Sequence, residues 1–331
     1  MKYSHILSYV ARTPWAIAED KMHEILSVLA FRASGGTFTP AEIEARIGGG
    51  SSPAQARTQG AVAVIPIRGV IAHRMGSMDD TSGGTSTERI GAMLKQVASD
   101  ESVGTIVYDI DSPGGTVPGV QELAAQMFAL RGVKRQVAQV NSLAASAAYW
   151  LASQADEIVS IPSGMAGSIG VFTVLEDLSA ALEKEGVKVD VIRAGKYKAE
   201  GNPFEPLSDE GRAHIQGQVD TAYAQFVKDV ARGRGVSVAD VKAGYGEGRA
   251  LTAQAAKAAR LIDRIDTLDG TLAKLTGRRA GMRADAAFIA DIEAADRAFI
   301  EGTGSETPVG IVAHMDMELA EADRRRRLER F

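Results

Sequence analysis

The segment QVAQVNSLAASAAYWLA, residues 136–152, predicts a strand that runs directly into a helix. Its first five residues form a short β-type run, residues 141–145 are mostly small, and the residues from Ser146 onward are good helix formers. Ser146 is therefore expected at a strand-to-helix junction. Unpaired backbone N–H groups and the helix dipole favour developing negative charge at a helix N-terminus, and an acyl-transfer enzyme can use this.

Two features on either side of this junction suggest a chemical role. Asp111-Ser112-Pro113-Gly114-Gly115 forms a glycine turn, and Lys198 lies in a polar loop. A serine hydroxyl is a poor nucleophile until a base takes its proton, and the tetrahedral intermediate then needs two backbone donors. The N–H groups of Gly115 and Ala147 are candidate donors, because glycines at 114 and 115 let a peptide approach the backbone closely.

The residues alone leave the base open. No histidine lies between Ser146 and Lys198, so a histidine base would have to be His73 or His214. A lysine can serve if burial lowers its pKa until it is neutral near the working pH. Pro-Gly-Gly is a common turn and a loop lysine is usually a solvated surface charge, so neither identifies a reaction by itself.

Strand and helix patterns alternate outward from this centre. Strands are expected at 61–67, 103–110, 157–161 and 187–192, and helices at 87–99, 117–130, 175–185 and from a cap at Ser208 onward. This alternation is typical of parallel βαβ units and predicts an α/β fold. Residues 73–87 lack periodicity and are expected to form a mobile loop.

The flanking regions predict separate parts of the chain. Thr13-Pro14 resembles a helix cap followed by proline, so residues 1–47 are expected to form a helical N-terminal extension. Residues 48–60 are rich in Gly and Ser and predict a flexible linker, followed by a catalytic domain at 61–275. Residues 276–331 form a charged tail, a candidate for binding a scaffold or another partner. Its basic run Arg324–Arg327 is too small a patch to predict nucleic-acid contact.

The composition narrows the classes of protein. With 331 residues, 45% of them hydrophobic, the chain can bury a sizeable core. The absence of cysteine excludes disulfides and thiolate chemistry and fits a reducing compartment. The five histidines are scattered, so no metal or cofactor is expected. Neither a signal-peptide core nor an apolar window of about 18 residues occurs, so we expect a soluble, cytoplasmic protein without a membrane span.

Four ordered motifs together resemble the signal peptide peptidase A family of serine-lysine proteases, most closely its phage head-maturation (prohead) branch. The motifs are DSPGG at 111–115, ASAAY at 145–149, AGSIGV at 166–171 and GKYK at 195–198. The resemblance covers about residues 61–275. It implies a ClpP/crotonase-like spiral of βαβ units, with Ser146 as nucleophile and Lys198 as general base.

The same resemblance implies supporting roles for other residues. Ser168 would orient the lysine, Gly115 would supply an oxyanion-hole N–H, and Gly114 would support it. Two alternatives are weaker. Ser142 precedes the junction, and Lys196 lies two residues before Lys198.

The chain departs from the family pattern at two places. Relatives commonly have Gly-Gly after the nucleophile, whereas Ala147-Ala148 stands here. Arg260 stands where relatives tend to have glycine, which leaves open how the preceding helix ends. Membrane-anchored relatives carry an N-terminal span, and its absence favours the phage branch.

The resemblance implies a homo-oligomeric serine endopeptidase that cleaves scaffold, portal or capsid proteins during phage head maturation, in the host cytoplasm or the procapsid. Residues 48–60 and 302–308 are then expected to be cut first, by the enzyme itself. Other functions stay open: a soluble signal-peptide or oligopeptide peptidase, an acyl-CoA enzyme of the crotonase type, and a capsid assembly scaffold without activity. The crotonase reading would leave the Ser146/Lys198 pair unexplained, and retention of both residues argues against the scaffold.

Overall fold

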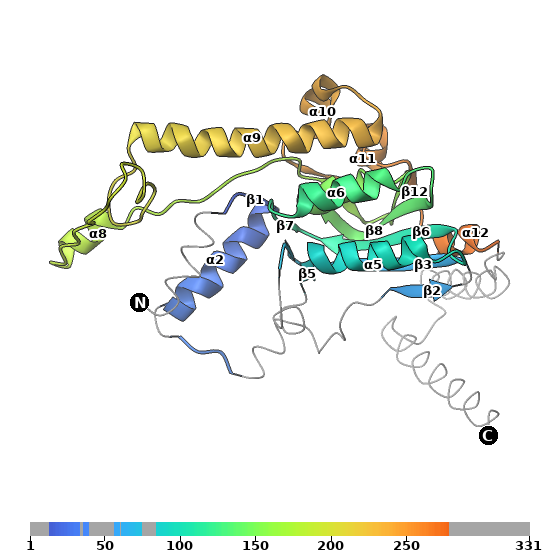
Figure 1. Cartoon of the computed structure of the whole chain (residues 1–331), viewed down its shortest axis with the longest axis horizontal. Helices are drawn as coiled ribbons and strands as arrows, with labels where there is room; N and C mark the ends of the chain where they lie inside the picture. The colour runs from blue at the N-terminus through green and yellow to red at the C-terminus, as the bar shows by residue number, and fades with distance from the viewer. Residues whose placement is uncertain (1–12, 34–35, 40–55, 60, 75–83, 278–331) are drawn as a thin grey trace, which may run out of the picture. The chain divides into compact units, whose positions relative to one another are not determined.

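Strands and helices alternate through the centre of the chain, which confirms the predicted α/β fold with parallel βαβ units. The computed structural model describes residues 13–33, 36–39, 56–59, 61–74 and 84–277, all within the unit Met1–Arg278. The larger sheet has the order β11-β10-β8-β6-β3-β2, with β9 and β12 beside it (Figure 1). Its strands are β2 Arg57–Gln59, β3 Val62–Arg68, β6 Thr105–Ser112, β8 Arg135–Ala145, β9 Glu157–Ser160, β10 Met165–Gly167, β11 Ala250–Thr252 and β12 Arg264–Ile265.

A second, smaller sheet lies at the carboxyl end of β6. Its order is β1-β7-β4-β5, and its strands are β1 Trp15–Ile17, β4 Ile71–Ala72, β5 Thr85–Ser86 and β7 Gly114–Thr116. β7 follows β6 after one residue, Pro113, so the predicted glycine turn is the point at which the chain passes from the large sheet to the small one.

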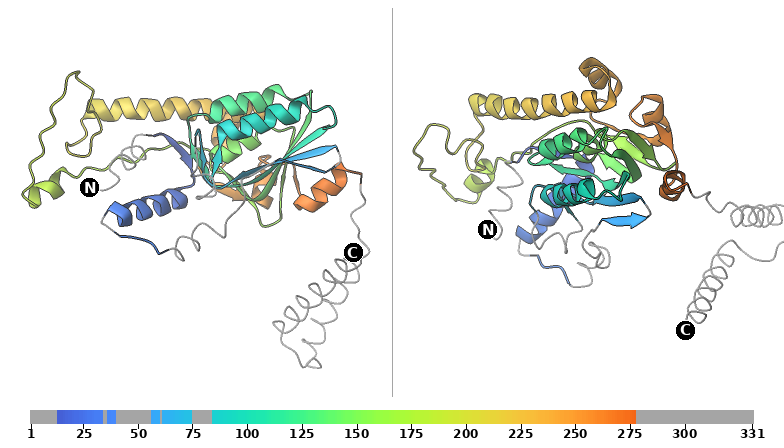
Figure 2. Two further views of the ribbon diagram at one scale, coloured as in Figure 1. Left: turned by 60° about the horizontal axis from the view of Figure 1, so that its bottom comes forward. Right: turned by 45° about the vertical axis from the view of Figure 1, so that its right-hand side comes forward.

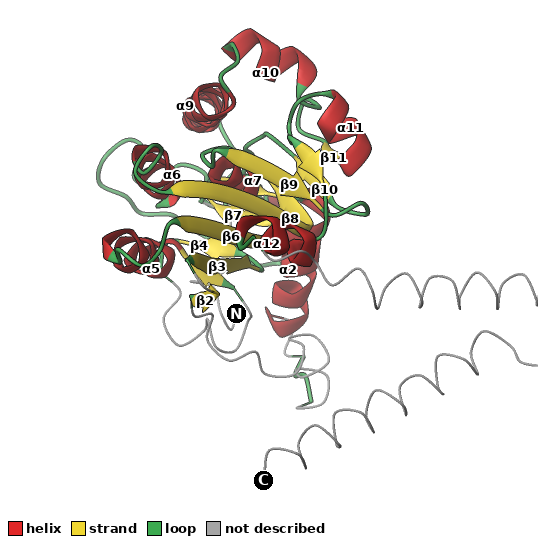
Figure 3. Cartoon of the chain, turned by 90° about the vertical axis from the view of Figure 1, so that its right-hand side faces the viewer, coloured by secondary structure: helices red, strands yellow, loops and turns green. Residues whose placement is uncertain are grey.

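Helices lie on both sides of the large sheet (Figure 3). Side chains that alternate along its parallel strands are buried on each face. On one face, Ile106, Tyr108 and Val140 belong to the main core, which α5 (Thr87–Ser99), α6 (Val120–Ala129) and α7 (Ala147–Ala152) complete. On the other, Val107 and Val137 form a smaller cluster with three leucines of α12 (Leu268–Leu275). Each strand is therefore fixed in register by two hydrophobic clusters.

A long helix, α9 (Asp209–Arg234), packs on α7 through aromatic rings. Trp150 of α7 stacks on Phe226 with ring centroids 4.5 Å apart, and its indole N–H donates to Asp229 at 3.0 Å. As predicted, Ser208 caps α9 by accepting a hydrogen bond from the Gly211 N–H. The other helices are α2 Glu19–Ala33, α8 Ser179–Lys184, α10 Val238–Gly244 and α11 Ala253–Ala258.

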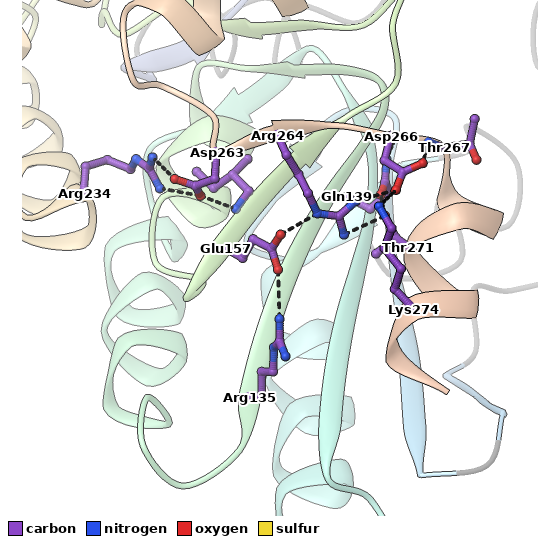
Figure 4. A network of polar contacts seen from close by, with 11 residues as sticks. Arg135, Gln139, Glu157, Arg234, Asp263, Arg264, Asp266, Thr267, Thr271 and Lys274 are labelled. Carbon is purple, nitrogen blue, oxygen red and sulfur yellow. Dashed lines mark hydrogen bonds and ion pairs between the residues drawn. The ribbon is translucent and has the colours of Figure 1, made fainter. Parts of the chain in front are cut away.

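A network of charged groups ties α12 and β12 to the large sheet (Figure 4). Arg264 on β12 forms ion pairs with Glu157 of β9 and with Asp266, and Lys274 of α12 also pairs with Asp266. The hydroxyl of Thr271 donates to the buried amide of Gln139 on β8. These bonds satisfy polar groups that α12 covers, so they help to fix the end of the described fold.

Several sequence predictions are wrong. Trp15–Ile17 is a strand, and the N-terminal helix begins at Glu19, because residues 15–17 pair with β7. β8 continues to Ala145 because β10 and Ser112 pair with residues 143–145. Residues 187–192 form no strand and the predicted helix 175–185 shrinks to α8, because this segment has no strand partner and little to bury it within the described fold.

Other predictions fall on residues that the structure does not describe. These are most of the linker at 48–60, residues 75–83 of the predicted loop, and the tail beyond residue 277. Among the described residues, no helix has both the length and the apolar character needed to cross a bilayer.

Candidate active site

Ser146 lies where the strands of the large sheet end. The register pairs Ser112 with Ala144 on one side and Gly167 with Ala145 on the other, so the turn after β6 and the end of β10 flank the serine. Ligand sites in parallel α/β sheets form at the carboxyl ends of strands. The predicted strand-to-helix junction is therefore placed where such a site is expected.

The backbone of Ser146 has an unusual conformation, with φ 55° and ψ −118°. Its N–H donates to the Gly167 carbonyl at 2.8 Å, and its own carbonyl accepts from the Trp150 N–H at 2.9 Å. The hydroxyl donates to the Gly170 carbonyl at 3.3 Å, and the residue is 1% exposed. Sparsely populated backbone conformations of this kind cost about 1–3 kcal/mol each and persist where the surrounding structure determines them.

The two glycines of the turn are both required by close contacts. Gly114 has φ 99°, and a Cβ there would collide with the Ala16 carbonyl and lie 3.0 Å from the Ser146 Cβ. A Cβ on Gly115 would overlap the Ile71 carbonyl. Ala147 is the first residue of α7, and the first N–H groups of a helix have no intrahelical partner. The structure thus brings Ser146 and the glycine turn together.

Asp111, at the start of the same turn, is exposed but lies close enough to the protein to be partly desolvated. Burial raises the pKa of its carboxyl, and the positive charge of Arg68 works in the opposite direction. Arg68 forms an ion pair with buried Asp109. These carboxyl groups lie on the strand that leads to the turn.

Lys198 lies on the surface of the described structure. It is exposed and lines a recess of about 240 Å³ with Pro14 and with His214 and Gln218 of α9. None of the hydrogen bonds of Ser146 in the described structure involves Lys198. Gln218 precedes Phe226, on which α7 packs, by eight residues, or about 12 Å of helix.

The segment that carries Lys198, residues 171–207, is called the arm below. Figure 2 shows it and the first half of α9 extending beyond the sheet in both views. Ile192 is 96% exposed, and Val187, Val189, Tyr197 and Phe204 are also exposed. The arm thus presents apolar side chains that the rest of the described chain does not cover.

The remaining predicted residues have different surroundings. Ser168 has φ 54°, and its N–H donates to the Arg249 carbonyl, with no hydrogen bond to Lys198 in the described structure. Ser142 is exposed, and Lys196 forms an ion pair with Glu210. His73 lies near the start of α6, within 3.1 Å of the Thr87 hydroxyl.

Two features of the site were not predicted. Trp15-Ala16-Ile17 pairs with the glycine turn, and the only sequence signal was three β-compatible residues after a proline. Arg260 takes a left-handed conformation with φ 62° after α11. Its carbonyl accepts hydrogen bonds from Arg234 and Tyr245, which helps to hold this helix end.

A known protein family matches the part of the chain that contains Ser146 and Lys198, and known proteins are similar to this chain. The profile of Peptidase family S49 matches residues 129–281. Capsid assembly protease C of Escherichia phage lambda is 32% identical over 271 residues, which are 77% of this chain and 61% of the relative. The head-tail preconnector protein GP5 of Enterobacteria phage P21 is 36% identical, over 60% of this chain and 40% of the relative.

Cellular proteins are also similar to this chain. A putative protease of Synechocystis is 32% identical, over 57% of this chain and 68% of the relative. A putative signal peptide peptidase SppA of Enterococcus faecium is 30% identical, over 53% of this chain and 52% of the relative. The chain spans 61%, 40% and 58% of the first three curated relatives. The family profile matches residues 129–281, which include Ser146, Ser168 and Lys198, and the Synechocystis protease is 32% identical with 68% of its length covered, so the chain belongs to peptidase family S49.

Proposed function

We propose that the chain is a serine endopeptidase in which Ser146 is the nucleophile and Lys198 the general base. The observation that carries the proposal is the packing of Ser146 against the Gly114-Gly115 turn at the ends of the parallel strands. The parallel order of β3, β6 and β8, with the glycine turn after β6 and the serine after β8, also supports the ClpP/crotonase-like spiral that the resemblance implies. In this proposal the protease domain spans residues 61–275, and β2 at the end of the preceding linker adds an edge strand to its sheet. The N-terminal extension lies before the linker in sequence, and the tail follows the domain.

The chemistry assigns one role to each group. The Ser146 hydroxyl attacks the carbonyl carbon of a peptide bond while its proton passes to the base. The N–H groups of Gly115 and Ala147 stabilise the oxyanion that forms. The protonated base then donates to the leaving amine, and water releases the acyl group from Ser146 by the same steps.

We propose that the base reaches Ser146 from a second copy of the chain. In one chain Lys198 is exposed on the arm and makes no hydrogen bond with Ser146. The apolar side chains of the arm, of which Ile192 is the most exposed, are suited to packing on a neighbour. A homo-oligomer would therefore bury the arm and complete the dyad, with Ser168 beside the incoming lysine.

The names of two relatives support a proposal for the substrate class. One is named as a capsid assembly protease, and another as a head-tail preconnector protein, both from phages. We therefore propose that this chain cleaves scaffold, portal or capsid proteins during head maturation. This would take place in the host cytoplasm or the procapsid.

Cleavage of casein by purified variants tests the dyad. Ser146→Ala and Lys198→Ala should each lower kcat/KM by about 10³-fold or more, whereas the matched variants Ser142→Ala and Lys196→Ala should keep most activity. Circular dichroism would show that all four are folded. Wild-type cleavage by folded Ser146→Ala protein would exclude this nucleophile. The opposite result would be a pH dependence of the rate that follows a group with a pKa of about 6.5, with no activity left in the His214→Ala variant. That result would exclude a lysine base.

A further inference from the structure

Strand β1 passes directly over the proposed catalytic groups. It runs antiparallel to β7 and pairs Ala16 with Gly115. The Ala18 N–H donates to the Pro113 carbonyl at 2.8 Å, and the Val117 N–H donates to the Pro14 carbonyl at 3.1 Å. Hydrogen-bonded pairs alternate along an antiparallel ladder, so Ala16 and Gly115 also form such a pair. The Ala16 carbonyl therefore faces the N–H assigned to the oxyanion hole.

The other edge of β1 is paired as well. The Trp15 N–H donates to the Phe172 carbonyl at 2.8 Å, and the Phe172 N–H donates back to the Trp15 carbonyl at 3.0 Å. β1 thus lies between β7 and the segment that follows Gly170, whose carbonyl accepts the Ser146 hydroxyl. An extended peptide held on both edges beside a nucleophile has the arrangement of a bound substrate.

Contacts at Gly114 confirm how near β1 lies to the nucleophile. A Cβ built on Gly114 would touch both the Ala16 carbonyl oxygen and the Ser146 Cβ, so both groups lie within contact distance of one point. Pro14, two residues earlier, lines the recess that also contains Lys198. The path of β1 therefore leads from the recess of Lys198 to Ser146.

β1 and α2 are packed as a module of their own. Trp15, Ile17 and Met22 form a cluster separate from the main core, joined by Ile25, Leu26, Leu29, Val70 and Phe172. Most of its side chains come from β1 and α2, so the module can leave while the main core stays intact. Ala16 is the exception, because it is fully buried and belongs to the main core.

We propose that residues Thr13–Ala18 are an internal pseudo-substrate that closes the peptide-binding channel until the β1–α2 module is displaced. The channel then takes an extended peptide with a small residue in the place of Ala16, whose carbonyl meets the Gly115 N–H. The proposal rests on the proposed protease function for the role of Ser146. The occupied edge itself is independent of that function.

Full-length protein with Trp15→Ala and Ile17→Ala tests the displacement. Amide exchange of Gly115, Val117 and Phe172 should become at least about tenfold faster, while amides of β6 and β8 stay protected. Added peptide TPWAIA, the sequence of residues 13–18, should restore the protection, and the same peptide with Phe in place of Ala16 should not. Lys21→Ala, on the exposed face of α2, is the matched control. Loss of protection throughout β6 and β8 would show that β1 belongs to the core and would overturn the proposal.

Labelling by a fluorophosphonate probe links displacement to the nucleophile. In the double variant Ser146 should label at least about tenfold faster than in the wild type, and TPWAIA should slow it again. Faster exchange with an unchanged labelling rate would show that β1 does not block the site. The exchange measurements are repeated in a Ser146→Ala background. Absence of labelling in every variant would then reject the nucleophile without changing the exchange result.

Discussion

The sheet body at residues 105–152 and the arm at residues 171–207 carry the two halves of the proposed dyad and are built in opposite ways. The body holds Ser146 in a strained, buried position between paired strands. The arm contains one short helix, α8, and leaves Lys198 and Ile192 exposed. In the proposed dyad, the nucleophile would be prepared within one chain, whereas the position of the base would depend on what the arm contacts.

Mixing two inactive variants would test this contrast most severely. Ser146→Ala protein keeps a working arm and Lys198→Ala protein keeps a working body, so co-assembled subunits should recover about one quarter of the wild-type activity if each site combines two copies. The measurement is casein cleavage after the two proteins are unfolded and refolded together. The same variants refolded separately are the control. No recovery in mixed oligomers would place both residues of each site in one chain.

The next largest expected effect is on stability, and it should differ between a substitution in the core and one in the arm. Trp150→Ala removes a buried ring and a hydrogen bond to Asp229 and should lower the free energy of unfolding by about 3–5 kcal/mol. Ile192→Ala should change the unfolding of the monomer by less than about 0.5 kcal/mol and instead weaken assembly. Denaturant unfolding of dilute protein and light scattering at high concentration separate the two effects. Ile192→Ala with unchanged assembly would remove this residue from the interface.

The smallest expected effect concerns the charged network of α12. The hydrogen bond from Lys274 holds the pKa of Asp266 below its usual value. The pair therefore stabilises the fold at pH values above the unfolded pKa of about 3.9. This stabilisation is lost as the pH falls through the folded pKa. Lys274→Met should lower the free energy of unfolding by less than about 1 kcal/mol at pH 7. It should leave this free energy unchanged at a pH below the folded pKa of Asp266. Urea unfolding between these pH values measures it, with Lys257→Met, an exposed lysine of α11, as control. An equal loss at every pH would contradict the electrostatic explanation.

Local patterns predicted the parts of the fold that depend on neighbours in sequence. The junction at Ser146, helix α5 and the Ser208 cap follow from residues within a few positions, and all three are present. The strand Trp15–Ile17 could not be foreseen, because its pairing partners lie about 100 and 157 positions away. Val187–Ile192 failed for the converse reason, since its β-type residues find no strand to pair with in the described chain.

The residues of the candidate site also differ in how far local sequence patterns predict their positions. Gly114 and Gly115 were identified with Ser146 because each has a recognisable local pattern, and the structure places them in contact. The position of Lys198 relative to Ser146 depends on the path of the arm, which no local pattern encodes. Its role as base remains a prediction.

The backbone of Ser146 also bears on how this protein can change over generations. With φ 55° this position would suit glycine better than any residue with a side chain, so the hydroxyl is kept at a cost in stability. Replacement by glycine would relieve strain and remove the nucleophile in one step. A lineage released from the need to hydrolyse peptides would therefore drift toward a more stable, inert protein at this residue first.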